Sequence, residues 1–224
     1  MENQYTRTQY LFNEKFHKIQ SATICVVGLG GVGGQALVTL ARTGVTNFII
    51  CDFDTVNITN CNRQVVANLN TIGKLKTDIC EDILKAINPN IQIIKINQKF
   101  SKDLDLFSYH FDYLIDAIDD VDNKYLLIKK CLENEVNFIS SMGTAKKFDL
   151  KKLEIIDINK TEYDPLAKII RKKLRDDNLK VKFNCLSSKE EVKLKGTNLG
   201  SYMPVTATAG LMIADYVIKQ IINN

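Results

Sequence analysis

Closely spaced glycines are the first residues in this chain whose pattern indicates chemistry. A short apolar run at residues 24–27 is followed directly by an apolar-periodic segment that opens with Gly28, Gly30, Gly31, Gly33 and Gly34. Gly28 allows a tight turn, Gly30 lets the backbone approach a ligand, and Gly33 lets a helix lie close to a strand. The free N–H groups at the start of that helix would face a phosphate group. These glycines predict a phosphate-binding turn.

The loop after the next apolar run carries side chains that bind sugar and phosphate groups. The run at residues 48–51 ends at Asp52, and a dehydrogenase would use an acid at this place to hold a ribose. Asp54, Asn60 and Arg63 follow in the same loop, although a dehydrogenase has no use for Arg63. The guanidinium of Arg63 can hold two phosphate oxygens at once. Asn60 can hydrogen-bond to phosphate or to backbone.

Two further positions extend this set of polar residues. Lys76 stands at the start of a helix, where it is either directed at the same anion or a solvated lysine. Asp119 and Asp120 end a later apolar run, and carboxylates beside Arg63 and Lys76 suit Mg²⁺ bound to a triphosphate. A helix-cap role is the alternative for Asp120. Together the residues predict an ATP site built to break a phosphate bond.

Alternating strands and helices must position these residues. The sequence predicts strands at residues 23–27, 47–51, 91–96, 113–117 and 136–140, and helices at 32–43, 75–87, 103–108 and 122–134. This alternation is typical of an α/β fold with a doubly wound, mainly parallel, Rossmann-like sheet covered by helices. Ligands of such sheets bind at the carboxyl ends of the strands, where the loops carrying the polar residues lie.

The second half of the chain has a different pattern of strands, helices and loops. It predicts strands at 153–158 and 180–185, a helix at 165–175, a polar loop through 200 and a closing helix at 205–222. We therefore expect an ATP-binding Rossmann-like domain over residues 1–145 and a C-terminal α/β extension over 146–224, packed on the same domain. Pro204 directly precedes the closing helix, and Asp215 lies in its middle. Both residues favour a buried helix over a membrane span.

Composition narrows the class of protein. The chain has 224 residues, of which 45% are hydrophobic and 25% charged, as is ordinary for a soluble globular protein. Its six cysteines are scattered and form no CxxC pair, so neither a four-cysteine zinc site nor a disulfide framework is expected. Cys185 is either a nucleophile or, from its apolar surroundings, a buried thiol. The cysteine pattern predicts a reducing, cytoplasmic compartment.

Positive charge is concentrated in one segment. Residues 146–195 hold 15 basic and 9 acidic side chains, whereas residues 1–145 hold 14 and 16. The expected helix at 165–175 places its apolar residues Leu166, Ile169, Ile170 and Leu174 on one face and leaves, facing outward, Lys168, Arg171, Lys172, Lys173 and Arg175. This outward face is either a solvated surface or a patch for a polyanion such as RNA.

The motifs also resemble a known family. In order and spacing, GLGGVG, DFD…NRQ, IGKLK and DAIDD are similar to the ubiquitin-activating-enzyme-like, ThiF/MoeB-type adenylyltransferase superfamily. The resemblance implies that Asp52 holds the ribose of ATP, that Arg63 and Lys76 hold phosphates, and that Asp119 binds Mg²⁺. It places Asn60 near the α-phosphate. Members often complete the ATP site with an N-terminal arginine from the partner subunit of a homodimer, and Arg7 is the candidate here, with a mobile surface arginine as the alternative.

The second half resembles one branch of that superfamily, the tRNA threonylcarbamoyladenosine dehydratases. The resemblance is carried by the segment at residues 140–175, by the strand around Cys185 and by the run at residues 200–210. It implies an ATP-dependent tRNA-modification enzyme that dehydrates and cyclises N6-threonylcarbamoyladenosine in tRNA by activating its threonyl carboxylate. It also favours tRNA contact by the cationic helix at 165–175.

Other functions are open at this point. An adenylyltransferase that activates the C-terminus of a ubiquitin-like sulfur-carrier protein is the main alternative, although such enzymes usually have two CxxC pairs. A sulfur-transfer or sulfur-acceptor protein is accordingly a candidate partner. A nicotinamide oxidoreductase would need neither Arg63 nor Lys76, and a pure nucleotide-binding scaffold would bind ATP without turnover.

Overall fold

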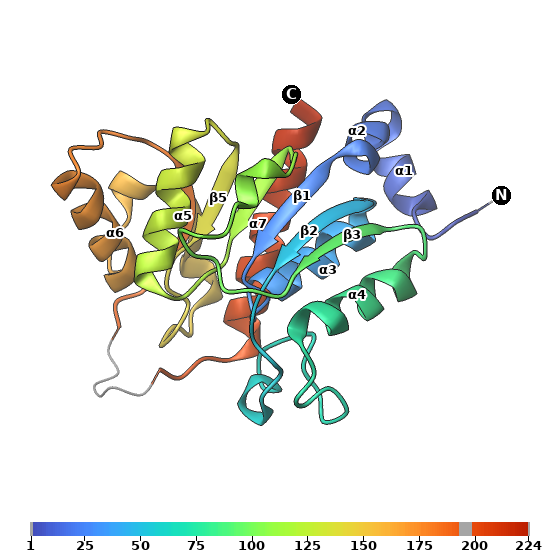
Figure 1. Ribbon diagram of the computed structural model, residues 1–224, viewed down its shortest axis with the longest axis horizontal. Coiled ribbons are helices and arrows are strands. Elements are labelled where there is room, and N and C mark those ends of the chain that lie inside the picture. Colours follow the sequence, from blue (N-terminus) through green and yellow to red (C-terminus); the bar gives the residue numbers. More distant parts are fainter. Residues whose placement is uncertain (1, 193–198, 224) are drawn as a thin grey trace.

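The structure, a computed structural model, describes residues 2–192 and 199–223 and is built on one seven-stranded sheet (Figure 1). The strands have the spatial order β3-β2-β1-β4-β5-β7-β6. Neighbouring strands are parallel except β6 and β7, which are antiparallel. Their bounds are β1 Thr23–Val27, β2 Asn47–Cys51, β3 Gln92–Ile96, β4 Tyr113–Asp116, β5 Phe138–Ser141, β6 Leu153–Asp157 and β7 Asn184–Ser188.

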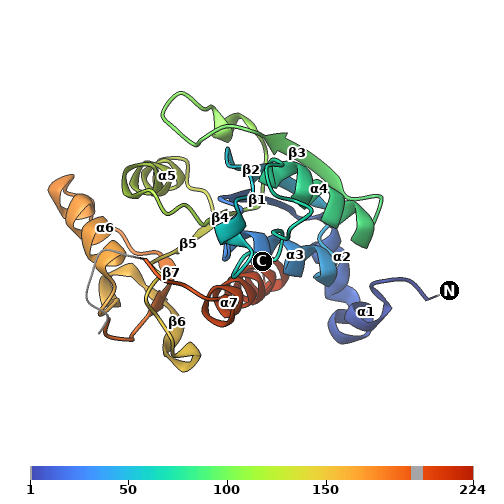
Figure 2. The same ribbon diagram turned by 90° about the horizontal axis from the view of Figure 1, so that it is seen from below.

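Helices cover both faces of the sheet (Figure 2). Their bounds are α1 Thr6–Phe12, α2 Phe16–Ser21, α3 Gly33–Thr43, α4 Lys76–Ile87, α5 Val121–Glu133, α6 Pro165–Asp176 and α7 Met203–Asn223. Buried residues of α2, α3, α4 and α7 share one hydrophobic core, and those of α5 and α6 share the other. In β1, Ile24 and Val26 belong to the first core, whereas Cys25 and Val27 belong to the second. Burial on both faces explains why β1 is apolar from Ile24 to Val27.

The order of the strands creates a point at one edge of the sheet where the connections diverge. From β1 the chain moves outward through β2 to β3, and it then returns to place β4 on the other side of β1. The carboxyl ends of β1 and β4 therefore form the topological switch point, where ligands bind in doubly wound sheets. Both the glycine turn after β1 and the Asp119 loop after β4 begin at this point.

Helix α7 is the longest element and lies against α3 (Figure 1). A Cβ on Gly210 would lie 2.6 Å from the Val32 carbonyl oxygen, so the two backbones are in close contact. With 21 residues and a mean hydropathy of 1.3, α7 is long and apolar enough to cross a membrane, and 44% of that stretch is buried in the structure. Packing against α3 accounts for its apolar residues, as expected for a core helix.

The fold class expected from the sequence is confirmed, with differences in detail. The strand expected at 180–185 is wrong in position, because β7 spans Asn184–Ser188 and includes two buried serines. Helices α1 and α2 were not expected, since both are short and rich in polar residues. Residues 193–198 of the expected polar loop lie outside the described residues. The division at residue 145 stays a prediction.

Candidate active site

The glycine turn has the geometry that the sequence predicted for it. Gly28 has a φ of +91°, and a Cβ there would lie 2.6 Å from the Ala117 carbonyl oxygen. A Cβ on Gly33 would lie 1.9 Å from the Gly28 carbonyl oxygen, which forbids any larger residue at the start of α3. At Gly30, apart from its two neighbours in the chain, a Cβ would meet one atom of the described residues within 4 Å, the side-chain Nε2 of Gln64 at 3.9 Å. The backbone of Gly30 is therefore open to a ligand.

Asp52 connects the glycine turn to the loop after β2. Its side chain is buried, and its Oδ2 accepts a hydrogen bond of 2.6 Å from the Leu29 amide. Its Oδ1 accepts from the Asp54 amide at 2.8 Å. Each carboxylate oxygen has more than one lone pair, so these bonds leave Asp52 able to accept from the hydroxyls of a ribose.

Lys76 is neither solvated nor free. Its side chain is 6% exposed, and its Nζ lies 2.6 Å from Asp54 Oδ2. Its backbone amide also donates to the Asp54 carbonyl oxygen at 3.0 Å, and an isolated bridge between Thr55 and Leu75 joins the same two segments. The loop after β2 thus holds the first turn of α4, and with it a cation, at the carboxyl edge of the sheet.

Arg63 and Asn60 lie on the connection between β2 and α4. The Nη1 of Arg63 donates to the Thr59 carbonyl oxygen at 2.8 Å and to Asn62 Oδ1 at 3.0 Å. Asn60 Oδ1 accepts from the Asn57 amide at 3.0 Å and closes a capping box on a short 3-10 turn. Half-buried Arg63 therefore keeps donors available for an anion, while Asn60 mainly shapes the turn.

The Arg63 loop packs against the start of α7. Thr206 Oγ1 donates to the Arg63 carbonyl oxygen at 3.2 Å, and a Cβ on Gly31 would lie 3.0 Å from that same hydroxyl. Asn62 Nδ2 donates to the Ser201 carbonyl oxygen at 2.8 Å. Three parts of the chain, the glycine turn, the Arg63 loop and the segment leading into α7, therefore meet at Thr206.

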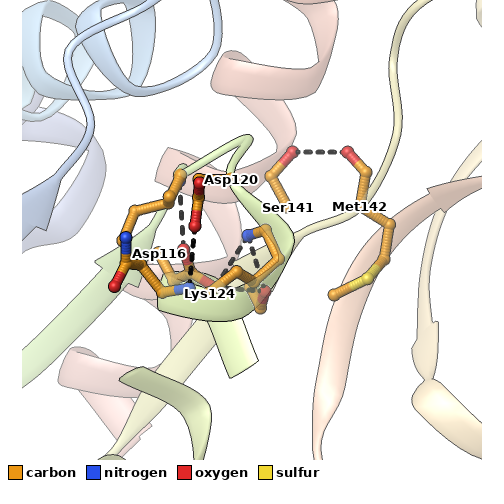
Figure 3. Close-up of polar contacts among 8 residues, drawn as sticks. Asp116, Asp120, Lys124, Ser141 and Met142 are labelled. Carbon is orange, nitrogen blue, oxygen red and sulfur yellow. Dashed lines mark hydrogen bonds and ion pairs between the residues drawn. The ribbon is translucent and has the colours of Figure 1, made fainter. Parts of the chain in front are cut away.

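A buried ion pair supports the loop after β4 (Figure 3). Asp116 and Lys124 have fully buried side chains, and Lys124 Nζ lies 2.7 Å from Asp116 Oδ2. Ser140 Oγ donates to the same oxygen at 2.6 Å, and Asp116 Oδ1 accepts from the Ile118 amide at 3.0 Å. The pair fixes the backbone that leads directly to Asp119.

Asp120 acts as a helix cap, the alternative that the sequence left open. Its Oδ1 accepts from the Asn123 amide at 2.9 Å at the start of α5. This bond, with the nearby Lys99 ammonium, holds the pKa of Asp120 below its usual value. Lys99 also lies 5.8 Å from the centre of the Phe53 ring, so it joins the loops after β2 and β4. A nucleotide contact by Asp120 remains a prediction.

Asp119 is suited to bind Mg²⁺ together with the phosphate oxygens of a nucleotide. Its side chain is exposed, and among the described residues none forms a hydrogen bond or ion pair with it. The described part of the chain contains no group of three metal-ligating side chains. Mg²⁺ at phosphate-binding sites commonly takes one or two carboxylates, with phosphate oxygens and water completing its shell. An exposed carboxylate in the loop after β4, at the same edge of the sheet as the glycine turn, fits that pattern.

The structure corrects the predicted cationic face of α6. Arg171 turns inward, since its Nη1 donates to the carbonyl oxygen of Thr161 at 3.0 Å and also to the Thr161 hydroxyl. Lys173 pairs with Asp122 at 2.9 Å and lies over the Tyr125 ring. The expectation that Arg171 faces solvent is therefore wrong, whereas Lys173 is partly exposed but its charge is paired. Ile169, expected on the apolar face, is 42% exposed.

Three cations of α6 do face solvent. Lys168, Lys172 and Arg175 are exposed and have no ion-pair or hydrogen-bond partner among residues 2–192 and 199–223. Their spacing of four and three residues places them on one face of the helix. We refer to these three residues as the α6 cationic face. Contact of this face with tRNA remains a prediction.

Two other candidates lie apart from the glycine turn. Cys185 is fully buried in β7, and burial raises the pKa of its thiol to about 12, so the buried-thiol interpretation is confirmed. Arg7 is exposed on α1, whose neighbour Tyr5 lies beside Ile87 and Arg42 near the carboxyl ends of α4 and α3. This is the edge of the sheet opposite the glycine turn, so Arg7 does not complete the site of its own chain.

Sequence analysis missed three residues of this region. Gln64 directly follows Arg63, Thr206 lies in α7, and Lys124 stands eight residues after its partner Asp116. Only Gln64 belonged to a motif already noted, the NRQ stretch. Thr206 is 143 residues from its partner Arg63, and nothing in the local sequence indicates that contact.

The fold and the site define a nucleotide-binding protein of the doubly wound α/β class. The sequence pattern of the ThiF family matches residues 2–224, and the chain belongs to this family. A relative from Bacillus subtilis, tRNA threonylcarbamoyladenosine dehydratase, is 33% identical over 245 residues, covering 100% of this chain and 96% of the relative. The Escherichia coli enzyme of the same name is 35% identical over 173 residues, covering 76% of this chain and 65% of that relative.

Solved structures agree with these sequence relatives. The crystal structure of the E. coli tRNA N6-threonylcarbamoyladenosine dehydratase in complex with ATP matches with a TM-score of 0.93 and 31% identity. The match covers 98% of this chain and 94% of that one. The resemblance to the ThiF/MoeB-type superfamily and to its dehydratase branch is therefore confirmed.

Proposed function

We propose that this protein uses ATP to dehydrate N6-threonylcarbamoyladenosine in tRNA, closing its side chain into a ring. The observation that supports this most strongly is the full-length match to an ATP-bound relative of that name. The glycine turn, Asp52, Arg63 and Lys76 supply an ATP site at the matching place in this chain.

The chemistry requires activation of a carboxylate. The threonyl carboxylate is a poor electrophile, because its leaving group would be oxide. Transfer of a phosphoryl group from ATP to a carboxylate oxygen releases ADP, and transfer of an adenylyl group releases pyrophosphate. The carboxylate then carries a good leaving group, phosphate or AMP. The neighbouring ureido nitrogen or oxygen then attacks the carbonyl carbon and expels that group, with a proton lost to solvent. Proximity within one nucleoside supplies much of the rate.

Residues at the switch point have separate roles in this proposal. Asp52 holds the ribose, and Asn60 lies near the α-phosphate. Arg63 and Lys76 stabilise the negative charge that grows on the phosphates. The Lys76 ammonium has three N–H donors, so it can meet a phosphate in addition to Asp54. Mg²⁺, when bound, would neutralise phosphate charge, and Asp119 is the side chain that would hold it.

Binding of tRNA is assigned to the α6 cationic face, Lys168, Lys172 and Arg175. RNA phosphates attract exposed lysine and arginine, and each contact releases counterions. Unlike Arg171 and Lys173, these three side chains have no partner within the described part of the chain. Their charges are therefore available to a polyanion.

A homodimer would complete the ATP site. Arg7 is exposed at the edge of the sheet opposite the glycine turn, so a second copy would have to bring its own Arg7 to this site. Interfaces of this kind in symmetric dimers form two equivalent sites. We further propose a cytoplasmic location, in keeping with six free cysteines among which five are buried.

Analysis of nucleosides tests the reaction directly. Bulk tRNA carrying N6-threonylcarbamoyladenosine is incubated with the protein, ATP and Mg²⁺, digested, and separated by mass. A product lighter by one water, formed only with ATP, supports the proposal; unchanged nucleoside with a folded, ATP-binding protein overturns it. Exchange of pyrophosphate into ATP only in the presence of a small protein ending in Gly-Gly would favour the less supported sulfur-carrier alternative. A sulfur-transfer or sulfur-acceptor partner stays a prediction that this exchange also tests.

A further inference from the structure

We propose that Gln64 binds the nucleotide, with its side-chain amide donating a hydrogen bond to a phosphate oxygen of ATP over Gly30. This inference rests on the proposed use of ATP. Gln64 is the residue after Arg63, and its backbone is fixed on both sides. The backbone N–H of Gln64 donates to the Asn60 carbonyl oxygen, and the backbone carbonyl oxygen of Gln64 accepts from the Ala67 amide, each at 3.0 Å.

The side chain of Gln64 lies next to the glycine turn. Gln64 is 6% exposed, and its Nε2 lies 3.9 Å from the place where a Cβ on Gly30 would stand. Apart from Gly30 and its two neighbours in the chain, no other atom of the described residues comes within 4 Å of that place. The carboxamide therefore lies at the border of the open space above Gly30, which is the space that a phosphate would occupy.

The hydrogen bonding of the carboxamide is incomplete. Gln64 Oε1 is the one buried side-chain oxygen or nitrogen among the described residues that has no hydrogen-bond partner. Buried polar atoms are nearly always paired, and leaving one unpaired costs about 1–3 kcal/mol. Its Nε2 likewise has no protein partner in the described part of the chain. Packing holds the amide in place, but no hydrogen bond fixes which end faces Gly30.

A triphosphate would satisfy this amide. Donors and cations lie at this edge of the sheet: the N–H groups at the start of α3, Arg63, whose carbonyl oxygen would lie 3.0 Å from a Cβ on Gly31, and the ammonium of Lys76. The two carboxylates at the same edge already have partners, since Asp52 accepts from the Leu29 amide and Asp54 pairs with Lys76. An anion is therefore the expected occupant, and a carboxamide meets an anion with its N–H₂ end. The Nε2 end already lies toward Gly30, so it can donate to a phosphate there without breaking a hydrogen bond to the protein.

Two substitutions of similar size separate binding from packing. Gln64→Met keeps the length of the side chain and removes both polar atoms, and Gln64→Glu keeps the shape but replaces the donor with a negative charge. Calorimetric titration with ATP and Mg²⁺ should show a Kd raised on the order of tenfold for Gln64→Met, the usual worth of a hydrogen bond to a charged group. Gln64→Glu should raise Kd further, because it repels the phosphates.

Thermal unfolding without ATP supplies the second readout. Gln64→Met should unfold at the same temperature as the wild type or higher, because it removes an unpaired buried oxygen. Gln92→Glu makes the same charge change on an exposed residue at the start of β3, the opposite edge of the sheet, and should leave Kd unchanged.

Several outcomes would overturn the inference. An unchanged Kd for Gln64→Met, or tighter binding by Gln64→Glu than by Gln64→Met, would exclude a donor role for Gln64. A wild-type protein that binds no ATP would overturn both this inference and the proposed function. Binding that weakens as expected in a protein that leaves tRNA unmodified would support Gln64 while rejecting the proposed substrate.

Discussion

The ammonium nitrogen of Lys76 lies 2.6 Å from Oδ2 of Asp54, and both residues stand at the carboxyl edge of the sheet. The Lys76 side chain is almost fully buried, whereas that of Asp54 is 46% exposed. The lysine is therefore held at the carboxyl edge of the sheet by the protein itself. A phosphate at this edge would share the same ammonium group with Asp54.

The first prediction concerns the two cations of the site. Lys76→Ala and Arg63→Ala should each lower kcat by roughly 10²-fold or more, the typical cost of removing one electrostatic stabiliser. The measurement is the initial rate of tRNA modification under multiple turnover, with ATP and tRNA both saturating. Lys74→Ala changes an exposed lysine two residues away and serves as the control, with activity expected to be unchanged. Near-wild-type turnover by either site variant would reject its role.

The second prediction concerns which subunit supplies Arg7. Arg7→Ala and Lys76→Ala should each be inactive alone, and mixing the two variants under conditions that exchange subunits should restore activity. A mixed dimer contains one site with an intact Lys76 and with Arg7 from the other subunit. If Arg7 acts within its own chain, no mixed dimer has a complete site and mixing restores nothing. A monomer with full activity in sedimentation would reject the dimer itself.

The third prediction concerns the buried ion pair under the Asp119 loop. Lys124→Met should lower the free energy of unfolding by about 3–5 kcal/mol, because it leaves Asp116 buried without its counter-charge. The double variant Asp116→Asn, Lys124→Met should recover part of that loss in denaturant unfolding. Lys129→Met removes a surface ion pair with Asp177 and should change stability little. Equal losses for Lys129→Met and Lys124→Met would contradict this account.

The fourth prediction concerns the α6 cationic face. Changing Lys168, Lys172 and Arg175 together to Ala should weaken tRNA binding and reduce its dependence on salt, because fewer counterions are released. Affinity for ATP and thermal stability should stay unchanged, since the three side chains are exposed and unpaired within the described residues.

A matched triple variant controls for net charge in that experiment. Changing Lys15, Lys102 and Lys219 to Ala removes the same charge from exposed positions on other elements. If both triple variants lose the same affinity and salt dependence, the effect is one of total charge. The α6 cationic face would then have no special role.

The fifth prediction concerns Asp164, which caps α6 through the Ala167 amide. Burial raises its pKa above the usual 3.8, so the folded state binds the proton more tightly than the unfolded state. Its contribution to stability is full below pH 3.8 and is lost as the pH rises through the folded pKa. We therefore expect the free energies of unfolding of the wild type and Asp164→Asn, measured with denaturant at several pH values, to differ by an amount that changes as the pH rises from 3.8 through the folded pKa.

The contribution of Asp177 to stability should have the opposite dependence on pH. Its hydrogen bond from Lys129 lowers the pKa of the carboxyl, so its contribution is present above pH 3.8 and is lost as the pH falls. Asp177→Asn should remove a fall in stability on the acid side. If the free energies of unfolding of the wild type and Asp164→Asn differ by the same amount at every pH, burial of the Asp164 carboxylate has no effect on proton binding.

The sequence by itself determined the local features of this protein. The tight turn at Gly28, the cap at Asp120 and the helix start at Asp164 depend on residues within a few positions of one another. Strands buried on both faces read as continuous apolar runs, and their alternation with helices defines a doubly wound sheet. The binding edge follows from that topology, so Asp52, Arg63 and Lys76 were placed at the correct edge from sequence.

Only the tertiary structure decided which partner each polar side chain has. Arg171 and Lys173 belong to the outward face by helical spacing, but Thr161 and Asp122, which lie on other elements, bind them. The register of β7 depends on its pairing with β5 and β6, which buries serines that look solvent-exposed in sequence. Gln64 lies beside Gly30 because the connection after β2 folds back over the glycine turn. These contacts join distant segments, and neither hydrophobic period nor local propensity carries information about them.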